Sequence, residues 1–415
     1  MRMLSDSELR LRLAATASSA APPRVVSGGN HAAPLALLSL VDDAIPAYRL
    51  WMLNAPVGIP DREGVEYETC FVGAGMRGSP RLTYTPARLS LAPSLFGTVF
   101  PPDVVLLHVA PARGGMLSLG IEVNVLPAAI EAARARGALV VAQVNPCMPY
   151  TTGDALLDPS LVDVAVAVDE PLPAVSAATL TDEHRVLGQR VAALVPEQAA
   201  IQIGIGAAPD ASLAALSSRR GLRIWSEMIS DGVMGLELAG ALDVEQSICT
   251  SFAVGSPEFY AWLDGNPRVR MLRTETTNNP CRIAAQPRMT SINTALQVDL
   301  HAQANAAWRG ERIHSGLGGQ PDFVVGALHS PGGRALIALL SWHPRAACST
   351  IVPRLTTPTT SSQHSFVVSE QGTATIFPSS EAEQARQLIE RVANPSCREE
   401  LAASLSGALR QGVLT

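Results

Sequence analysis

One acidic residue stands where a carboxylate could do chemistry. Glu227 closes the apolar run 222–225 and is followed at once by a polar, glycine-bearing turn in the segment WSEMISDG (225–232). A carboxylate held partly out of water can act as a nucleophile, whereas an isolated surface glutamate is simply solvated. This segment alone leaves both interpretations open.

A glycine-bearing turn precedes Glu227 in the chain. The segment GIGAAP (204–209) follows a predicted strand and precedes a predicted helix that Asp210 could cap. Glycines at such a turn let backbone N–H groups face an anion or a carbonyl oxygen. A tight connection between a strand and a helix, with no ligand, is the alternative.

A second glycine-rich stretch follows Glu227. The segment IHSGLGGQPDF (313–323) has three glycines within four positions, before a run at 323–327 that we predict as a strand. Glycine backbone without side chains can approach a ligand closely. The alternative is a flexible loop that binds no ligand. Together with the strand end before Glu227, the two glycine stretches could enclose a carboxylate beside a polarised acyl carbon.

The other motifs in the sequence give weaker evidence for a functional site. The segment GAGMRG (73–78) matches a dinucleotide fingerprint, but Pro80 and Pro86 deny it the following helix and no acid stands about 20 residues further on. We find no G-x-S-x-G elbow and no Walker loop. Five further polar residues are interpreted as core, loop or turn-capping residues rather than catalytic groups: His108, His314, His329, Asp231 and Asp322.

The elements that must position these residues alternate between short apolar runs and helical patterns, as in parallel α/β sheets. We predict strands at 104–109, 138–144, 162–168, 199–205, 222–225, 248–253, 323–327, 336–340 and 365–368. We predict helices at 125–136, 185–195, 210–216 and 380–391, and a loop at 356–363. The pattern breaks near 170–185, so we expect two α/β domains, at 1–176 and 177–415.

Composition and charge indicate a soluble protein with a small-molecule ligand. The 415 residues are 47% apolar and 16% charged, and no apolar stretch approaches the roughly 20 residues of a membrane span. The net charge is -6 and the positive charges are all arginine, without a basic stripe for nucleic acid. Charged residues at 6, 8, 10 and 12 interrupt any signal core, which favours a cytoplasmic start.

The cysteines are not spaced for a metal or a disulfide framework. The six lie far apart, without a C-x-x-C pair or a histidine at zinc-ligand spacing. We therefore expect reduced, mostly buried thiols and no bound metal.

Four segments in chain order resemble a known family. They are IQIGIGAAPDA (201–211), WSEMISDGV (225–233), SINTALQVDL (291–300) and IHSGLGGQPDFVVGA (313–327). They are similar to the acetyl-CoA hydrolase/transferase family, and further matching segments extend the resemblance over nearly the whole chain.

The resemblance implies a class I CoA-transferase fold, with two related α/β domains and the active site between them. It implies that Glu227 is the nucleophile and that CoA arrives as an acyl-CoA substrate, with a carboxylic acid as the second substrate. It also implies a homodimer, while the residues themselves predict a cytoplasmic protein without membrane or nucleic-acid partners. The implied oxyanion and acyl site comprises Gly204, Ile205, Gly206, Ala207, Asn293 and Gln297, and the implied CoA site comprises Gly316, Leu317, Gly318, Gly319 and Gln320.

Two departures from the family pattern keep the function open. Gln297 stands where the family commonly has a second glutamate, and the segment SWHPRAACST (341–350) replaces small residues, a lysine and a Ser-Arg pair. The CoA phosphates or the acid could therefore be bound differently. A CoA-transferase is the leading hypothesis, beside an acyl-CoA hydrolase that uses the same glutamate and a non-catalytic acyl-CoA-binding protein.

Overall fold

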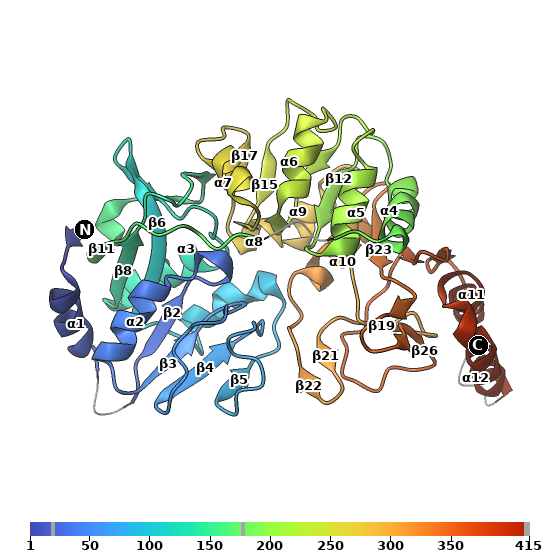
Figure 1. The fold of residues 1–415 in the computed structure, drawn as a ribbon, viewed down its shortest axis with the longest axis horizontal. Coiled ribbons are helices and arrows are strands. Elements are labelled where there is room, and N and C mark those ends of the chain that lie inside the picture. The colour runs from blue at the N-terminus through green and yellow to red at the C-terminus, as the bar shows by residue number, and fades with distance from the viewer. Residues whose placement is uncertain (18–20, 176–178, 411–415) are drawn as a thin grey trace. The chain divides into compact units, whose positions relative to one another are not determined.

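The computed structural model describes residues 1–17, 21–175 and 179–410, and the chain forms two compact units (Figure 1). The first consists of Met1–Ser176, Cys249–Thr277 and Ile313–Gly318, and the second of Ala177–Ile248, Asn278–Arg312 and Gly319–Thr415. Two short segments from the second half of the chain thus belong to the first unit.

The first unit is built on a parallel sheet. Its main path runs β1-β11-β8-β6-β2-β3-β4-β5, and each neighbouring pair on it is parallel. The bounds are β1 (Arg2–Met3), β2 (Arg24–Ser27), β3 (Tyr48–Trp51), β4 (Val65–Thr69), β5 (Leu82–Tyr84), β6 (Val104–Arg113), β8 (Leu139–Val144) and β11 (Val164–Ala167). Strands buried on both faces read as continuous apolar runs, and this is why β6 and β8 coincide with predicted strands.

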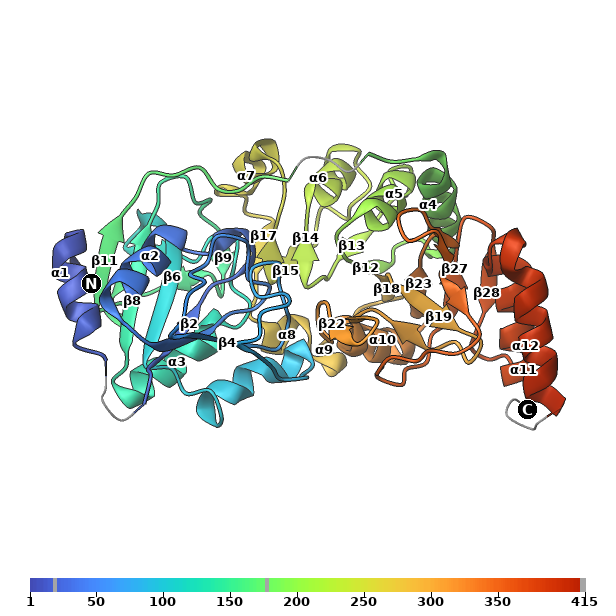
Figure 2. The ribbon, with the colours of Figure 1, turned by 60° about the horizontal axis from the view of Figure 1, so that its bottom comes forward.

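Helices cover both faces of this sheet. The apolar side chains of α1 (Asp6–Ala14) and α2 (Leu35–Ala44) pack into one buried core with alternate residues of β2, β3, β4 and β6. Helix α3 (Leu126–Arg136), predicted from its periodicity, lies on the opposite side from α2 (Figure 2). The unit's smaller elements are β7 (Met116–Ser118), β9 (Thr152–Gly153), β10 (Leu156–Leu157), β16 (Phe252–Ala253), β17 (Val269–Met271), α7 (Pro257–Leu263) and α8 (Thr274–Thr277).

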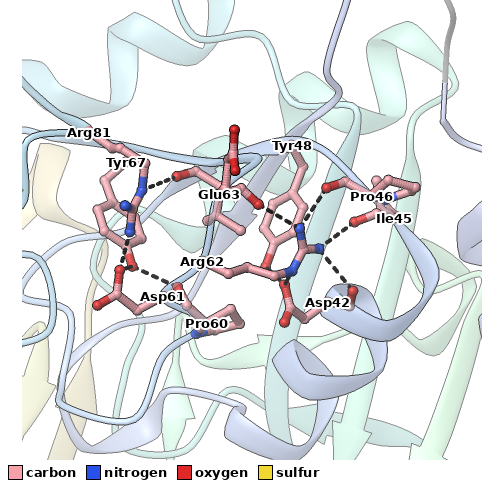
Figure 3. A network of polar contacts seen from close by, with 11 residues as sticks. Asp42, Ile45, Pro46, Tyr48, Pro60, Asp61, Arg62, Glu63, Tyr67 and Arg81 are labelled. Carbon is pink, nitrogen blue, oxygen red and sulfur yellow. Dashed lines mark hydrogen bonds and ion pairs between the residues drawn. The ribbon is translucent and has the colours of Figure 1, made fainter.

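An arginine holds the connection between β3 and β4 in place (Figure 3). The Arg62 guanidinium donates to the backbone carbonyls of Pro46 at 2.7 Å, Glu63 at 2.9 Å, Ile45 at 2.9 Å and Asp42 at 3.0 Å. It also forms an ion pair with the Asp42 carboxylate at 2.9 Å. One side chain therefore hydrogen-bonds to backbone carbonyls at the end of α2 and in the loop between β3 and β4.

The second unit has its own sheet, in the order β13-β12-β18-β23-β27-β28. All neighbouring pairs are parallel except β27 with β28. The bounds are β12 (Ala200–Ile203), β13 (Arg223–Ile224), β18 (Thr290–Asn293), β23 (Arg334–Ala338), β27 (Phe366–Val368) and β28 (Thr373–Thr375). The carboxyl ends of five strands, β13, β12, β18, β23 and β27, consequently meet at one edge.

Two groups of helices enclose this sheet. Figure 2 shows α4 (Asp182–Leu194), α5 (Ala207–Ala215) and α6 (Asp231–Leu238) on one face, with α9 (Pro280–Ala284) and α10 (Gln320–His329) on the other. The remaining elements of this unit are β14 (Met228–Ile229), β19 (Gln297–Asp299), β20 (Ala304–Asn305), β21 (Trp308–Arg309), β24 (Trp342–His343), β25 (Cys348–Ser349), β26 (Ile351–Val352), α11 (Glu381–Gln387), a π-helical turn (Leu388–Val392) and α12 (Arg398–Arg410). Strands β15 (Ile248–Thr250) and β22 (Arg312–Ile313) cross the boundaries of the units.

Three sequence predictions are wrong. The run 323–327 is part of helix α10, not a strand, and Phe323, Val324 and Ala327 on it pack into a buried core. Helix α5 begins before Asp210, so its N-cap is Gly206. Among the six free cysteines only Cys70 is buried, while those at 147, 281 and 348 are exposed.

Within the described residues, no helix is both long and apolar enough to cross a membrane.

Candidate active site

Glu227 follows directly on the carboxyl end of β13. The pairing of β13 with β12 puts Arg223 level with Ala200. The Trp225 N–H extends this pairing beyond β13 by donating to the Ile201 carbonyl at 3.1 Å. The next residue, Ser226, is fully buried, and its Oγ donates to the Ile203 carbonyl at 3.0 Å. Glu227 is half-buried. Its backbone is thus fixed by the sheet through the serine that precedes it.

The Glu227 carboxylate lies against two residues of the second unit. The side-chain amide of Asn278 donates a hydrogen bond to Glu227 Oε2 at 2.7 Å, and Asn278 is fully buried. A Cβ atom added to Gly319 would lie 1.7 Å from the same oxygen. Gly319 must therefore be a glycine for the carboxylate to keep this position.

The carboxylate also lies at the N-terminus of a helix. Gly319 is the N-cap residue of α10, and its carbonyl accepts the Phe323 N–H at 3.0 Å. Unpaired N–H groups and the helix dipole make such a terminus favourable for an anion. The sequence indicated neither this contact nor Asn278, which is 51 residues away from Glu227 along the chain.

The first glycine turn lies beside Glu227. Continuing the register of β12 with β13 places Gly204 level with Glu227, and continuing that of β12 with β18 places it level with Asn293. Gly206 has φ +116°, and a Cβ on either glycine would meet no atom within 4 Å. Residues 204–207 therefore lead, through an open turn, to the first-turn N–H groups of α5, which have no partner within the helix.

The two predicted amide residues lie in different sheets. Asn293 ends β18 and exchanges two side-chain hydrogen bonds with Gln202, at 3.2 and 3.3 Å. Gln297 begins β19, which pairs with β20 and β26 rather than with the main sheet. The Asn293 amide is therefore at the same edge as Glu227 and Gly204, whereas Gln297 lies on the small sheet that follows.

The second glycine stretch is divided between the units. Gly316 forms a bridge with Phe71 in the first unit, where a Cβ would lie 2.5 Å from the Cys70 carbonyl oxygen. Gly318 has φ +57° and accepts the Leu89 N–H at 3.0 Å. Packing against the protein's own backbone thus accounts for Gly316, and the positive φ accounts for Gly318. Gly319 and Gln320 belong to the second unit.

Two of the histidines that the sequence assigns a structural role, His108 and His329, occupy ordinary structural positions. His108 is buried, and burial lowers its pKa to about 4, so the ring is neutral; its Nε2 lies 3.0 Å from the Asn145 amide nitrogen. His329 is exposed at the end of α10. The dinucleotide-like glycines also serve packing, since a Cβ at Gly73 or Gly75 would lie within 2.3 Å of backbone atoms.

The fold is that of the CoA-transferase class. The crystal structure of 4-hydroxybutyrate CoA-transferase from Porphyromonas gingivalis matches with a TM-score of 0.79 and 28% identity, covering 98% of this chain and 97% of that one. The crystal structure of RipA from Yersinia pestis matches with a TM-score of 0.89 and 26% identity, covering 100% and 98%.

Sequence comparison identifies the family. The acetyl-CoA hydrolase/transferase C-terminal domain matches residues 255–405. The 4-hydroxybutyrate coenzyme A transferase of Clostridium kluyveri is 35% identical over an alignment of 385 residues that covers 88% of this chain and 89% of that protein. The chain belongs to the acetyl-CoA hydrolase/transferase family.

Proposed function

We propose that this protein is a CoA-transferase that moves CoA between an acyl-CoA thioester and a carboxylic acid, with Glu227 as the nucleophile. The observation that carries the proposal is the Glu227 carboxylate itself. It is half-buried at the carboxyl edge of a parallel sheet, bonded to Asn278 at 2.7 Å and packed on the N-cap of α10. Family membership supports the reaction type.

The first half-reaction forms an enzyme thioester. A Glu227 oxygen attacks the acyl carbonyl, the C–S bond breaks, and CoA leaves as a thiolate, giving a mixed anhydride. The thiolate then attacks the glutamyl carbonyl of the anhydride, and the acyl group leaves as a free carboxylate. The thioester bond energy is retained in glutamyl-CoA, so no ATP is consumed.

The second half-reaction reverses these steps with another acid. Its carboxylate attacks the glutamyl thioester, CoA thiolate leaves, and the thiolate then attacks the new acyl group to regenerate Glu227. Each step passes through a tetrahedral oxyanion. We propose that N–H groups of residues 204–207 stabilise it, because Gly204 is level with Glu227 and the turn is open.

The hydrogen bond from Asn278 has a defined part in this scheme. It restricts rotation of the carboxylate about its Cγ–Cδ bond and favours the ionised form, which is the nucleophile. Binding of the CoA tail, for which we propose residues 316–320, would help to bring the thioester to the glutamate. Water must be excluded from both intermediates, since hydrolysis of either would make the enzyme an acyl-CoA hydrolase.

Intact-protein mass spectrometry tests the proposal. Wild type, Glu227→Ala and the exposed-site control Glu245→Ala are incubated with acetyl-CoA, propionyl-CoA and butyryl-CoA. We expect a CoA adduct on wild type and the control but not on Glu227→Ala. Thioester loss that requires an added acid identifies a transferase, and loss without one identifies a hydrolase. No adduct and no thioester loss with any of the three would contradict both enzymatic functions and favour a binding protein.

We also propose that the enzyme is cytoplasmic and, from the resemblance, that it is a homodimer. Light scattering after gel filtration tests the assembly, with a mass of twice 43.6 kDa as the expected result.

A further inference from the structure

A short hairpin leaves the sheet of the second unit just beyond β23. Strand β24 pairs antiparallel with β25, with Trp342 opposite Ser349 and His343 opposite Cys348. We call residues 342–349 the 342–349 hairpin. Its tip, residues 344–347, is exposed, and Ala347 adopts φ +48°, which a residue other than glycine seldom does.

The base of the hairpin is firmly anchored. The Thr350 N–H donates to the Ser341 carbonyl at 3.1 Å, and the Thr350 hydroxyl donates to the Leu340 carbonyl at 2.7 Å. The Ser341 N–H donates to Glu370 Oε2 at 2.8 Å, and the Ser341 hydroxyl donates to the other oxygen of the same carboxylate. Ser341 and Thr350 are both buried. The base is thus fixed while the tip faces solvent.

The anchored base lies at the edge that carries Glu227. Strand β23 pairs with β18 so that Ile337 is level with Asn293, and the hairpin begins five residues further on. On its return the chain runs beside β19, where the Val298 N–H donates to the Thr350 carbonyl at 2.8 Å. The hairpin therefore starts beyond the strand that lies beside Asn293 and ends beside the strand of Gln297, and both of these residues are proposed for the acyl site.

The hairpin presents hydrogen-bond donors without acidic partners. His343 Nδ1 accepts the Ala346 N–H at 3.0 Å, so the neutral imidazole carries its proton on Nε2 and can donate it. Among the described residues, Arg345 has no ion-pair or hydrogen-bond partner, and its side chain is exposed. A guanidinium and an imidazole N–H on a hairpin with an anchored base can together bind an anionic oxygen group.

We propose that the 342–349 hairpin binds an anionic group of the substrate at a distance from the reacting carbonyl, with Arg345 as the principal contact. This inference rests on the proposed transferase function. A phosphate of CoA and a second carboxylate on the acid share the required chemistry. Strand β23, which leads into the hairpin, lies three strand spacings, or about 14 Å, from β13, which leads to Glu227. This separation of the two strands is longer than a short dicarboxylic acid and favours the phosphate end of CoA as the ligand.

Steady-state kinetics with matched substrates tests this inference. The donors are acetyl-CoA and acetyl-dephospho-CoA, which lacks the 3′-phosphate, and the acids are butyrate and succinate, which have equal carbon number. The variants are Arg345→Gln, Arg345→Lys and the control Arg220→Gln. Arg220 is exposed and precedes β13, at the opposite end of that strand from Glu227.

We expect Arg345→Gln to raise the KM for acetyl-CoA about 10-fold or more, as the loss of a charge-assisted contact predicts, without lowering kcat to the same degree. Arg345→Lys should restore part of the affinity because it keeps the charge. An unchanged KM for acetyl-dephospho-CoA assigns the contact to the 3′-phosphate, and an equal rise for both donors assigns it to the pyrophosphate. A rise for succinate alone assigns it to a second carboxylate.

Two results separate failure of the inference from failure of the function. If Arg345→Gln matches Arg220→Gln with both donors and both acids while wild type forms the Glu227 adduct, the hairpin inference is wrong and the function stands. If wild type forms no adduct, the transferase function fails, and titration calorimetry with CoA itself still tests the hairpin. Equal affinity of wild type and Arg345→Gln for CoA would then overturn the inference as well.

Discussion

The amide nitrogen of Asn278 lies 2.7 Å from Oε2 of Glu227, and Asn278 is fully buried while Glu227 is half-buried. A hydrogen bond to a charged group is stronger than one between neutral groups and fixes its geometry more firmly. Asn278 is therefore a positioning residue for the proposed nucleophile.

Replacing Asn278 by alanine should lower activity more than stability. We expect kcat/KM to fall about 10- to 100-fold, the range for one lost hydrogen bond to a charged group. Asn279→Ala is the matched control. Asn279 caps α9 through bonds to Cys281 and Arg282, so its loss should lower the free energy of unfolding by about 1 kcal/mol with little change in kcat/KM. Equal activity losses in the two variants would assign Asn278 a purely structural role.

Gly319→Ala should disable the enzyme without unfolding it. The added Cβ would lie 1.7 Å from Glu227 Oε2 and 2.4 Å from Asn278 Nδ2, both side-chain atoms that can move away. The backbone of Gly319, at φ -88° and ψ -10°, accepts alanine without strain. We expect a loss of about 100-fold or more in kcat/KM, since a displacement of about 1 Å can have that effect.

The control for Gly319→Ala is Gly235→Ala in α6, where a Cβ would meet nothing within 4 Å. This variant should keep full activity and gain about 0.5–1 kcal/mol in unfolding free energy, because alanine favours the helix. The measurements are initial rates and urea unfolding. Near-normal kcat/KM in Gly319→Ala would show that the carboxylate position is unimportant for catalysis.

Much of the fold could be predicted because buried parallel strands are continuous apolar runs. The strands β6 and β8 and the helix α3 agree with the predicted segments at 104–109, 138–144 and 125–136. The run at 323–327 was assigned to a strand because a short apolar run fits either element. Pro321 within the first turn and Gly319 as N-cap start a helix there, and burial on α9 completes it.

The site was less accessible to sequence reasoning. Glu227 could be singled out by its place after an apolar run and by the family resemblance. Its partner Asn278 could not, because a contact across 51 residues is set by how β13, α9 and α10 pack together. The same holds for Gly316, whose glycine requirement comes from the Cys70 carbonyl of a distant strand end.

Replacing Arg62 by lysine should destabilise the first unit (Figure 3). Lysine cannot donate at once to the four backbone carbonyls that the guanidinium reaches, and leaving the part-buried carbonyls of Asp42 and Ile45 unpaired is unfavourable. We expect the free energy of unfolding in urea to fall by about 2 kcal/mol or more. Arg10→Lys, which alters an exposed ion pair with Asp43, should change it by about 0.5 kcal/mol or less. Equal effects would contradict a special role for Arg62.

A buried carboxyl group in the first unit should make stability depend on pH. Burial raises the pKa of Glu122 to about 7, against hydrogen bonds from the Asn30 and Asn124 amides at 2.8 and 3.1 Å that favour the anion. In the unfolded chain the pKa lies near 4.5. The folded protein therefore retains this proton between pH 4.5 and 7 after the unfolded chain has lost it, and the contribution of Glu122 to stability falls as pH rises through that window.

The loss expected from Glu122 is about 3 kcal/mol across this window, at roughly 1.4 kcal/mol for each unit of pKa. His108 and His364 act in the opposite direction, because burial lowers each pKa from 6.5 to about 4 and their contribution is lost as pH falls through that range. The wild-type curve alone cannot isolate the carboxyl group, so the measurement is the difference between wild type and Glu122→Gln in urea unfolding from pH 4.5 to 8. The variant should become progressively more stable than wild type, relative to pH 4.5, until about pH 7. Parallel curves would show that Glu122 does not hold its proton in the folded protein.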